Sequence, residues 1–323
     1  MDGGLLARRE KRLLNKAFGL LDPDRAGIAL IDIGAAGAMP SRFAAVRDHV
    51  HYVGFEPDAR SRAALLARPQ PCLSYEILPH AIGAAQGEVA FHLCRKGEVS
   101  STFRPDREFL DRFPDPARFD IMDTASLPVI SLDDAGIGRC DFLKADIQGG
   151  ELDALRAGVR LLESCFGLEL EVEFQPLYAG QPLFCDVAKF AAAQGFALVD
   201  FVDLTRWTRK SDAVSRKELG TERFGQLVAG DALFLKMPEK ILADRHDQAA
   251  LRRYLAVLLV YRRNDLLLWM LAHLPEEEAF ASDALADLCR QLTRIVRHID
   301  RTQRLAKRLT LGTAAAYRYH LFY

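Results

Sequence analysis

Three apolar runs, each followed by a polar turn, dominate the first half of the chain. Residues 28–33 form the first run and lead into a turn from Gly34 to Gly37, and residues 51–55 form the second, which ends at Glu56. Each run has the length and the apolar content of a buried strand. The carboxyl ends of neighbouring parallel strands open onto one crevice. The pattern therefore predicts a βαβ unit with a ligand cleft beside Gly34 and Glu56.

The third run, residues 141–145, is followed by a polar turn and a helix. Gly149 and Gly150 allow a tight turn, and Glu151 opens the helix, where a carboxylate favours the helix dipole. Leu152 and later apolar residues continue it at helical spacing. We expect this third strand to lie beside the first, where the sheet reverses its order and a transferred group would bind.

Both ends of the chain have helical patterns. Apolar residues from Leu5 to Leu21 predict an amphipathic helix that ends near Asp22 and packs against the sheet. An apolar stretch near the other end, 255–274, is interrupted by Arg262, Arg263, Asn264 and Asp265, so no membrane span is expected. The predicted parts are an N-terminal helix over 1–27, an α/β domain over 28–238 and an α-helical C-terminal extension over 239–323.

The last predicted helix is amphipathic and basic. Between Leu292 and Arg308, apolar residues alternate with arginines and Lys307 at helical spacing. Three explanations stay open: a solvated charged face, packing of a homodimer through the C-terminal helices, and contact with an acidic or lipid-linked glycan.

Composition and charge narrow the class of protein. The 323 residues include 43 Lys and Arg and 44 Asp and Glu, for a net charge of -1. That balance gives no overall attraction to nucleic acid, which is not an expected partner. The six cysteines lack metal-ligand spacing and are expected to be buried free thiols. Residues 1–20 contain no signal-peptide core, so we expect a cytoplasmic protein.

The residues at the first two strand ends favour a cationic, nucleotide-like ligand. A dinucleotide site uses a third glycine to receive a pyrophosphate at a helix N-terminus, and this chain lacks it. Asp32 would repel an anion beside the turn. S-adenosylmethionine carries a sulfonium and an ammonium group and no phosphate, so it suits Asp32. Glu56 is then placed to bind the ribose hydroxyls.

Eight short segments of the chain form an ordered set of motifs. They are Asp32–Gly37, Glu56-Pro57, Ala81–Gly83 with Gly87-Glu88, Leu132–Asp134, Asp146–Glu151, Glu169–Phe174, Tyr178–Phe184 and Asp231–Leu235. Together they resemble the FkbM family of S-adenosylmethionine-dependent methyltransferases, over residues 28–237. At Ala36–Ala38 the chain departs from the family pattern, in which many members have an asparagine and a further glycine. The resemblance implies a Rossmann-like class I methyltransferase sheet with helices on both faces.

The resemblance also implies the cofactor and its contacts. The cofactor is expected to be S-adenosylmethionine. The matched motifs imply contacts with it at Asp32, Gly34, Ala35, Gly37, Glu56, Pro57, Ala81, Ile82 and Asp146. The class of acceptor follows from the resemblance alone: a small-molecule or glycan hydroxyl, on a sugar or a polyketide-like compound.

Methyl transfer to an alcohol needs a group that accepts its proton. Asp146 is the first candidate, because its strand-end position aims it into the crevice. Lys144 lies two residues back on the same strand face and belongs to the candidate catalytic set. Cofactor binding or organisation of the turn is the competing role for Asp146. His80 is the second candidate base, since an imidazole titrates near neutral pH, and a polar loop histidine is its alternative.

Candidate acceptor ligands come from two regions. The resemblance places Ser100 and Ser101 near the cleft, in a polar segment, 96–124, that we expect to lack regular structure and to act as a lid or as a solvated excursion. Gln148 and Glu151 of the motif at the third strand end are further candidates.

Carboxylates alternate along the next strand. Glu169, Glu171 and Glu173 point to one face, and burying them is costly unless they are paired. We expect Glu171 or Glu173 to meet substrate, a cation or a basic partner, although a structural salt bridge fits equally well. A divalent ion bridging Asp146 and one of these glutamates stays open, and no metal ligand is assigned.

The sequence thus predicts an S-adenosylmethionine-dependent O-methyltransferase. Two other classes stay open. A nicotinamide-dependent oxidoreductase would share the ribose-binding acid Glu56 but lacks the third glycine. A non-catalytic binding or scaffold protein would keep the fold and use the helical extension for its interaction.

Overall fold

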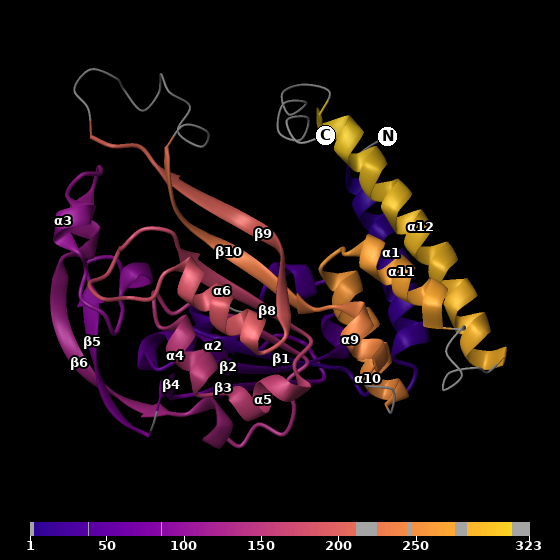
Figure 1. Cartoon of the computed structure of the whole chain (residues 1–323), viewed down its shortest axis with the longest axis horizontal. Coiled ribbons are helices and arrows are strands. Elements are labelled where there is room, and N and C mark those ends of the chain that lie inside the picture. The colour runs from indigo at the N-terminus through magenta and orange to yellow at the C-terminus, as the bar shows by residue number, and fades with distance from the viewer. Residues whose placement is uncertain are drawn as a thin grey trace. The chain divides into compact units, whose positions relative to one another are not determined.

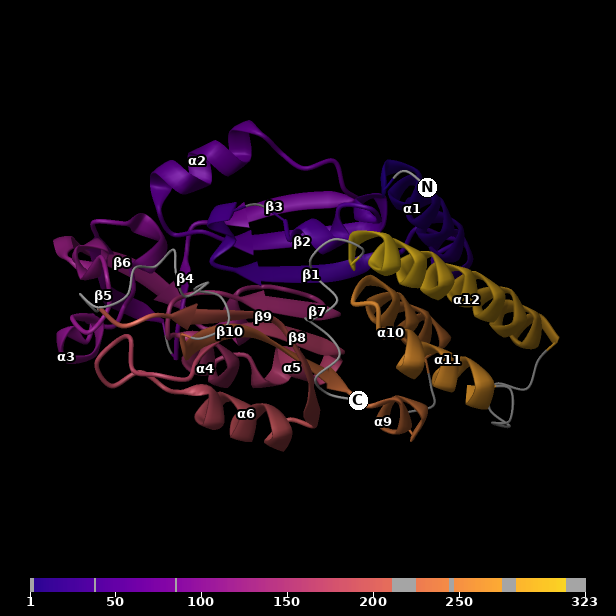
Figure 2. The ribbon, with the colours of Figure 1, turned by 90° about the horizontal axis from the view of Figure 1, so that it is seen from above.

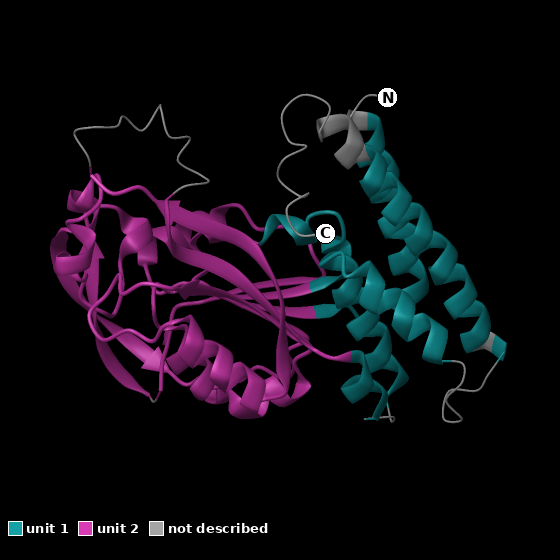
Figure 3. Cartoon of the chain, turned by 45° about the horizontal axis from the view of Figure 1, so that its top comes forward, with its two compact units in different colours: residues 1–28, 40–50, 238–323 teal, residues 29–39, 51–237 magenta. Residues whose placement is uncertain are grey.

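The computed structural model describes residues 3–37, 39–84, 86–210, 225–243, 247–274 and 283–311, with the backbone alone at 3–4, 284 and 306–311. The chain divides into two compact units (Figure 3). Unit 1 comprises residues 1–28, 40–50 and 238–323, and unit 2 comprises residues 29–39 and 51–237. Unit 2 contains the sequence motifs. Ala38 of the expected departure from the family pattern lies outside the described residues, as do the side chains of Lys307 and Arg308.

A seven-stranded sheet forms the centre of unit 2, in the order β3-β2-β1-β7-β8-β10-β9. The strands are β1 (Ile28–Ile33), β2 (Val50–Phe55), β3 (Ser74–Leu78), β7 (Phe142–Ala145), β8 (Gly167–Glu173), β9 (Phe196–Trp207) and β10 (Gln226–Lys236). β1, β7 and β8 are parallel, β2 is parallel to β3, and β10 is antiparallel to both of its neighbours. The predicted Rossmann-like class I sheet is confirmed, including the placement of the third run beside the first.

Helices lie on both faces of this sheet (Figures 1 and 2). They are α2 (Ala59–Ala67) on one face and α4 (Glu151–Arg156), α5 (Val159–Ser164) and α6 (Phe184–Ala193) on the other. α2 begins where the Asp58 carboxylate accepts hydrogen bonds from two backbone N–H groups of the first turn.

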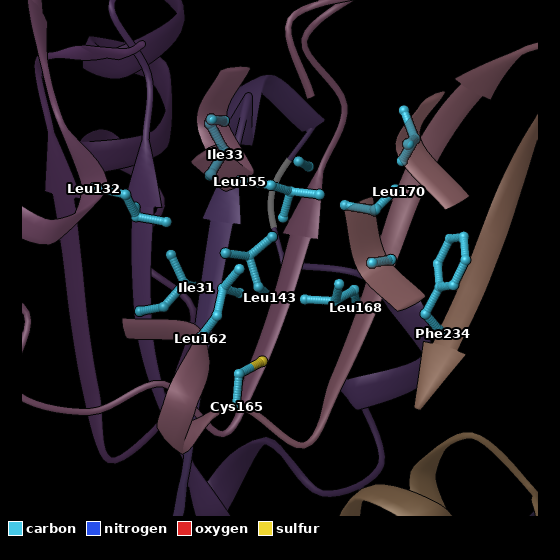
Figure 4. Packing of buried hydrophobic residues seen from close by; sticks show 14 of the residues in the cluster. Ile31, Ile33, Leu132, Leu143, Leu155, Leu162, Cys165, Leu168, Leu170 and Phe234 are labelled. Carbon is cyan, nitrogen blue, oxygen red and sulfur yellow. The ribbon is translucent and has the colours of Figure 1, made fainter. Parts of the chain in front are cut away.

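One face of the sheet is apolar and forms the main core. Ile31, Leu143 and Leu168 lie side by side on neighbouring strands and pack against Leu155 and Leu162 of the covering helices (Figure 4). Because successive strand residues point to opposite faces, the residues between them form the other face. The register pairs Asp32 with Lys144 and Lys144 with Glu169 there. The sheet therefore has one apolar and one ionisable face.

A second, smaller sheet follows β3 and corrects one expectation. It has the order β4-β6-β5, with β4 (Ala81–Ile82), β5 (Gly87–Cys94) and β6 (Ile121–Ile130). The segment 96–124 contains α3 (Arg107–Leu110), two 3₁₀ turns and the start of β6. Its Phe109, Phe113 and Phe119 pack with Tyr178 in a small core. The expectation of a segment without structure was wrong, because scattered buried phenylalanines stabilise it without any helical or strand periodicity.

Unit 1 is helical. Its helices are α1 (Gly3–Leu21), α9 (Pro238–Ala243), α10 (Gln248–Val260), α11 (Asn264–His273) and α12 (Asp283–Leu311). α1 ends beside Asp22, as the pattern predicted, and packs along α12, where Gln303 Nε2 donates to Glu10 Oε1 at 2.9 Å. Arg252 of α10 donates to the carbonyl of Leu20 at the end of α1. None of the described helices combines the length and the apolar content needed to cross a membrane.

The small core of residues 96–124 gives a stability prediction. Phe119 is 2% exposed, whereas Met122, three residues later, is 60% exposed. Phe119→Ala should lower the free energy of unfolding by about 3–5 kcal/mol, because it leaves a cavity, and Met122→Ala should change it by less than about 0.5 kcal/mol. Urea denaturation of both variants tests this. Equal, small effects would show that the segment contributes no core.

Candidate active site

The turn after β1 brings the ends of three strands together. Gly34 N donates to Phe55 O, and Asp146 N donates to Ile33 O, both at 3.0 Å. Gly34 has φ +84°, and a Cβ atom there would lie 2.1 Å from Asp146 O. Both the conformation and the space therefore require glycine. Gly34 is the point where β1, β2 and β7 meet.

A pocket of about 320 Å³ lies beside this turn. Four predicted cofactor residues line it: Gly34, Pro57, Ala81 and Ile82. His80 lines it as well, and its Nδ1 is buried without a hydrogen-bond partner among the described residues. Four of the predicted cofactor residues and the second candidate base therefore border one pocket.

Other residues that line this pocket were not proposed from the sequence. They include Thr102 and four apolar residues of the small sheet, namely Val89, Phe91, Leu127 and Val129. These residues alternate along β5 and β6, which predicts strands but not the surface that they face. The sequence did contain a hint that Thr102 belongs to the site, because it directly follows the two serines proposed as acceptor ligands.

The other predicted cofactor residues lie around the turn and do not line the pocket. Ala35 is buried in the 3₁₀ turn Ala35–Gly37. Around Gly37 the structure leaves open space where a Cβ atom would lie. Glu56 is 5% exposed, and its Oε1 accepts a hydrogen bond from Asp58 N at 2.8 Å. Burial raises the pKa of Glu56.

Lys144 lies among carboxylates on the ionisable face of the sheet. Its Nζ is 4.0 Å from Asp32 Oδ1 and 3.6 Å from Asp146 Oδ2. Burial acts to lower the pKa of Lys144, but the neighbouring carboxylates, Asp32 first, outweigh burial, and the pKa is raised. Lys144 is therefore an ammonium at neutral pH. It can orient and neutralise carboxylates but cannot accept a proton.

Asp32, beside Lys144, is almost completely buried. Burial raises its pKa to about 6, although Lys144 and the Tyr52 hydroxyl oppose that rise. The Tyr52 hydroxyl donates to Asp32 Oδ2 at 2.8 Å, whereas Oδ1 accepts no hydrogen bond from the residues that the structure describes. A buried carboxylate oxygen without a donor is a site for a cationic or hydrogen-bonding ligand group.

The turn after β7 is held by Glu151. Its two carboxylate oxygens accept hydrogen bonds from Ile147 N at 2.7 Å and Gly149 N at 3.0 Å. Gln148 and Gly149 both have positive φ, 59° and 100°. Glu151 is 2% exposed, and burial raises its pKa well above the ordinary value. The side chain that the sequence proposed as an acceptor ligand is thus engaged in fixing the turn.

Gln148 links the turn to three other elements. Its amide nitrogen donates to Asp146 Oδ1 at 3.3 Å and to a carboxylate oxygen of Glu171. Its amide oxygen lies 2.8 Å from the Tyr178 hydroxyl. Ser101 Oγ donates to its backbone carbonyl at 2.6 Å. Gln148 therefore fixes the Asp146 carboxylate relative to β8 and to the segment 96–124.

The two predicted serines are buried rather than open to the pocket. Ser101 is fully buried against Gln148, and Ser100 accepts a hydrogen bond from Cys94 N at 3.0 Å. The structure brings Ser101 to the turn after β7, while Ser100 stabilises the end of β5.

The glutamates of β8 lie on the ionisable face, as their alternation predicted. Burial, followed by the charge of Asp146, raises the pKa of Glu171 well above its ordinary value and that of Glu173 to about 7. Asp231 of β10 lies opposite Glu171 in the register, and its pKa is raised to about 6, again by burial first. Asp231 was not proposed from the sequence, although it lies in a matched motif. Because their pKa values are raised, these carboxyl groups hold more protons near neutral pH than exposed carboxyl groups do, and those that stay ionised repel a further anion.

Asp146 is the more accessible of the two carboxylates described as pairing with Lys144. Its side chain is 41% exposed, against 2% for Asp32. It can therefore meet a ligand directly. No hydrogen bond among the described residues joins it to His80. Within the described ranges, no three His, Cys, Asp or Glu side chains are grouped so as to hold a metal ion, so the divalent-ion alternative has no ligand set there.

Comparison with known proteins shows which family this chain matches. A family model, described as the methyltransferase FkbM domain, matches residues 32–198, just over half of the chain. The 2-O-methyltransferase NoeI of Sinorhizobium fredii is 26% identical over 203 residues, which cover 55% of this chain and 82% of that protein.

Two solved structures also overlap with this chain. The methyltransferase FkbM from Methylobacillus flagellatus has a TM-score of 0.35 and 13% identity, over 65% of this chain and 43% of that one. Magnesium protoporphyrin IX methyltransferase from Synechocystis, solved with bound S-adenosylmethionine, has a TM-score of 0.35 and 10% identity, over 71% of this chain and 79% of that one.

The close contact between Gly34 and the Asp146 carbonyl gives a prediction about stability. Gly34→Ala places a Cβ atom 2.1 Å from Asp146 O, so we expect a loss of more than about 2 kcal/mol in the free energy of unfolding. Gly37→Ala, where the space is open, is the matched control and should cost less than about 1 kcal/mol. Thermal and urea unfolding measure both. Similar stabilities of the two variants would contradict the close contact.

The buried carboxyl groups give a pH prediction. Because the pKa of Asp32 is raised from 3.8 to about 6, the folded state binds its proton more tightly than the unfolded chain. This contribution to stability is complete below about pH 4 and is lost as the pH rises through about 6. Asp32→Asn should therefore remove a fall on the order of 2–3 kcal/mol between pH 4 and pH 8. Urea unfolding across that range, with Asp123→Asn as an exposed control, measures the difference. Parallel curves for wild type and Asp32→Asn would refute it.

Proposed function

This chain belongs to the FkbM family of methyltransferases, and on that premise we propose that it transfers the methyl group of S-adenosylmethionine to a hydroxyl oxygen of a sugar, glycan or polyketide-like acceptor. Transfer to oxygen is supported by the similarity to a 2-O-methyltransferase. The sugar and polyketide-like classes rest on the family resemblance.

The chain's own residues fit this cofactor in three ways. Gly34 keeps the strand ends open to a close backbone approach. The pocket beside it has apolar walls suited to an adenine ring. Asp32 presents a buried oxygen without a donor, and the surrounding carboxylates favour a cation. When bound, the cofactor supplies a methyl group on a sulfonium, which is a good leaving group.

Each part of the site then has a proposed role. Gly34, Pro57, Ala81 and Ile82 contact the adenosine part, with His80 at the same wall. Glu56 uses its second oxygen for a ribose hydroxyl, because Asp58 N occupies the first. Asp32 attracts the cationic end of the cofactor.

The observation that carries the chemistry is the position of Asp146. It follows β7 directly beside Gly34, and Lys144 and Gln148 hold its carboxylate. We propose that Asp146 accepts the acceptor's hydroxyl proton while the oxygen attacks the methyl carbon. With the cofactor bound, methyl transfer would leave the electron pair of the broken carbon–sulfur bond on the departing sulfur, and Asp146 would hold the proton that the acceptor oxygen loses. Lys144 pairs with this carboxylate, its Nζ lying 3.6 Å from Asp146 Oδ2.

We propose that Gln148, Glu171 and Glu173 face the acceptor. The raised pKa values of the two glutamates leave protons that can be donated to sugar oxygens, and their carboxylate forms accept hydrogen bonds. Such a surface suits a neutral polyol better than a phosphorylated one.

Two further proposals concern the setting of the protein. The cytoplasm is the proposed compartment, on the ground that all six cysteines are free thiols, four of them buried. A homodimer through the C-terminal helices stays a proposal, and the domain limits at residues 27 and 238 stay predictions.

Calorimetric titration with S-adenosylhomocysteine, with NAD in parallel, tests the cofactor. We expect micromolar binding of S-adenosylhomocysteine and none of NAD. Binding of NAD alone would favour the oxidoreductase alternative. Binding of neither ligand would favour the scaffold alternative.

Asp146→Asn tests the proton acceptor. With an acceptor found by screening nucleotide sugars and glycans for methylation, this variant should bind S-adenosylhomocysteine as the wild type does but turn over at least about a hundredfold more slowly. Asp123→Asn, on an exposed position of β6, should keep full turnover. Loss of cofactor binding in a folded Asp146→Asn variant would instead make Asp146 a cofactor ligand.

A further inference from the structure

Charge is distributed very unequally between the two units. Unit 1 contains 22 Lys and Arg against 15 Asp and Glu, and unit 2 contains 21 against 29. The chain as a whole has a net charge of only -1. Such an asymmetry within one chain indicates a surface for an anionic partner on the basic part.

The basic residues of α12 form a single row. Its exposed arginines, at steps of four and three residues, are Arg290, Arg294, Arg297, Arg301 and Arg304. At about 100° per residue they lie within about 80° of the helix circumference and extend over about 21 Å. The opposite side of the helix is buried in unit 1, with Leu292 and Val296 nearly inaccessible. The row therefore faces away from the core of the unit.

Part of this row has no internal partner. Arg290 pairs with Asp287, and Arg304 pairs with Asp300. Arg294, Arg297 and Arg301 form no ion pair with any residue that the structure describes. From Arg301 to the end of the chain the sequence contains no acidic residue. The centre of the row is thus free to bind an external anion.

α1 repeats the arrangement. Arg8, Arg9, Arg12 and Lys16 are exposed on this helix and form no ion pair within the described part of the chain. By helical spacing they share a face with Leu5. Leu5 is 50% exposed, and Leu305, on the arginine face of α12, is 37% exposed. Each basic face therefore carries an exposed leucine.

An exposed leucine among arginines fits a surface that is anionic outside and apolar beneath. In sequence alone, residues 312–323 also combine arginine with apolar residues, Arg318 lying among Tyr317, Tyr319, Leu321, Phe322 and Tyr323. Tyrosine and arginine place apolar parts in a membrane interface while their polar ends stay hydrated. Nucleic acid would use the arginines but would leave the leucines exposed.

We propose that the basic faces of α1 and α12 dock unit 1 peripherally on an anionic lipid bilayer. The attraction is electrostatic, with shallow insertion of Leu5 and Leu305. The apolar side of α12 remains in the core of unit 1, because it already packs there. This proposal does not depend on the reaction proposed above.

Sedimentation with lipid vesicles tests the proposal on the full chain. We expect binding to phosphatidylcholine vesicles that contain phosphatidylglycerol, little binding to phosphatidylcholine alone, and release by salt. The combined variant Arg294→Glu, Arg297→Glu and Arg301→Glu should bind the anionic vesicles at least about tenfold more weakly, since each basic residue contributes roughly fivefold.

A charge-matched control isolates the surface. Arg60→Glu, Arg68→Glu and Lys189→Glu change the same total charge at exposed positions of unit 2 and should bind vesicles as the wild type does. Leu305→Asn should weaken vesicle binding without changing the salt dependence. Calorimetry with S-adenosylhomocysteine and circular dichroism confirm that each variant is folded.

Three results would overturn the proposal. They are equal binding to neutral and anionic vesicles, an equal loss in both charge-reversed variants, and binding of a labelled RNA oligonucleotide without binding of vesicles. The last result would assign the row to nucleic acid. Failure of the vesicle experiment with intact S-adenosylhomocysteine binding would leave the proposed reaction untouched.

Discussion

The contact between Gly34 and the Asp146 carbonyl is the constraint on which the site depends. It brings the ends of β1 and β7 closer than any side chain at Gly34 would allow. As a result, one glycine borders the apolar pocket, and Asp146, the residue after β7, lies next to it. A ligand bound along the strand ends can then meet both a shaped apolar wall and a charged group.

The ionisable face of the sheet holds several buried charged groups close together. One ammonium group, Lys144, serves several carboxylates, and burial of each carboxylate is costly. The remaining charge is reduced by protonation, as the raised pKa values of Asp32, Glu173 and Asp231 indicate. Burying these groups costs folding free energy. Clusters of this kind are typical of sites where the groups act on a ligand.

The sequence predicted the parts of this structure that local patterns determine. β1, β2 and β7 follow from apolar runs, and Gly34, Asp32 and Asp146 follow from their positions at strand ends. The opposition of Asp231 and Glu171 could not be foreseen, because it depends on the register of two antiparallel strands that lie sixty residues apart. Ser100 and Ser101 were proposed as site residues, whereas it is Thr102 that lines the pocket. All three side chains carry a hydroxyl group, so the residue type alone does not tell which of them faces the pocket. The core around Phe119 was missed because contacts between irregularly spaced phenylalanines leave no periodic signal.

The hydrogen bonds of Gln148 connect the segment 96–124 to the turn after β7. Its backbone carbonyl receives Ser101 Oγ, and the Tyr178 hydroxyl lies within reach of both its side chain and Val99 O. Tyr178 also packs in the core around Phe119, so that core and Gln148 are joined through one side chain. A substitution inside that core can therefore shift Gln148, and with it the Asp146 carboxylate, without replacing any residue of the turn itself.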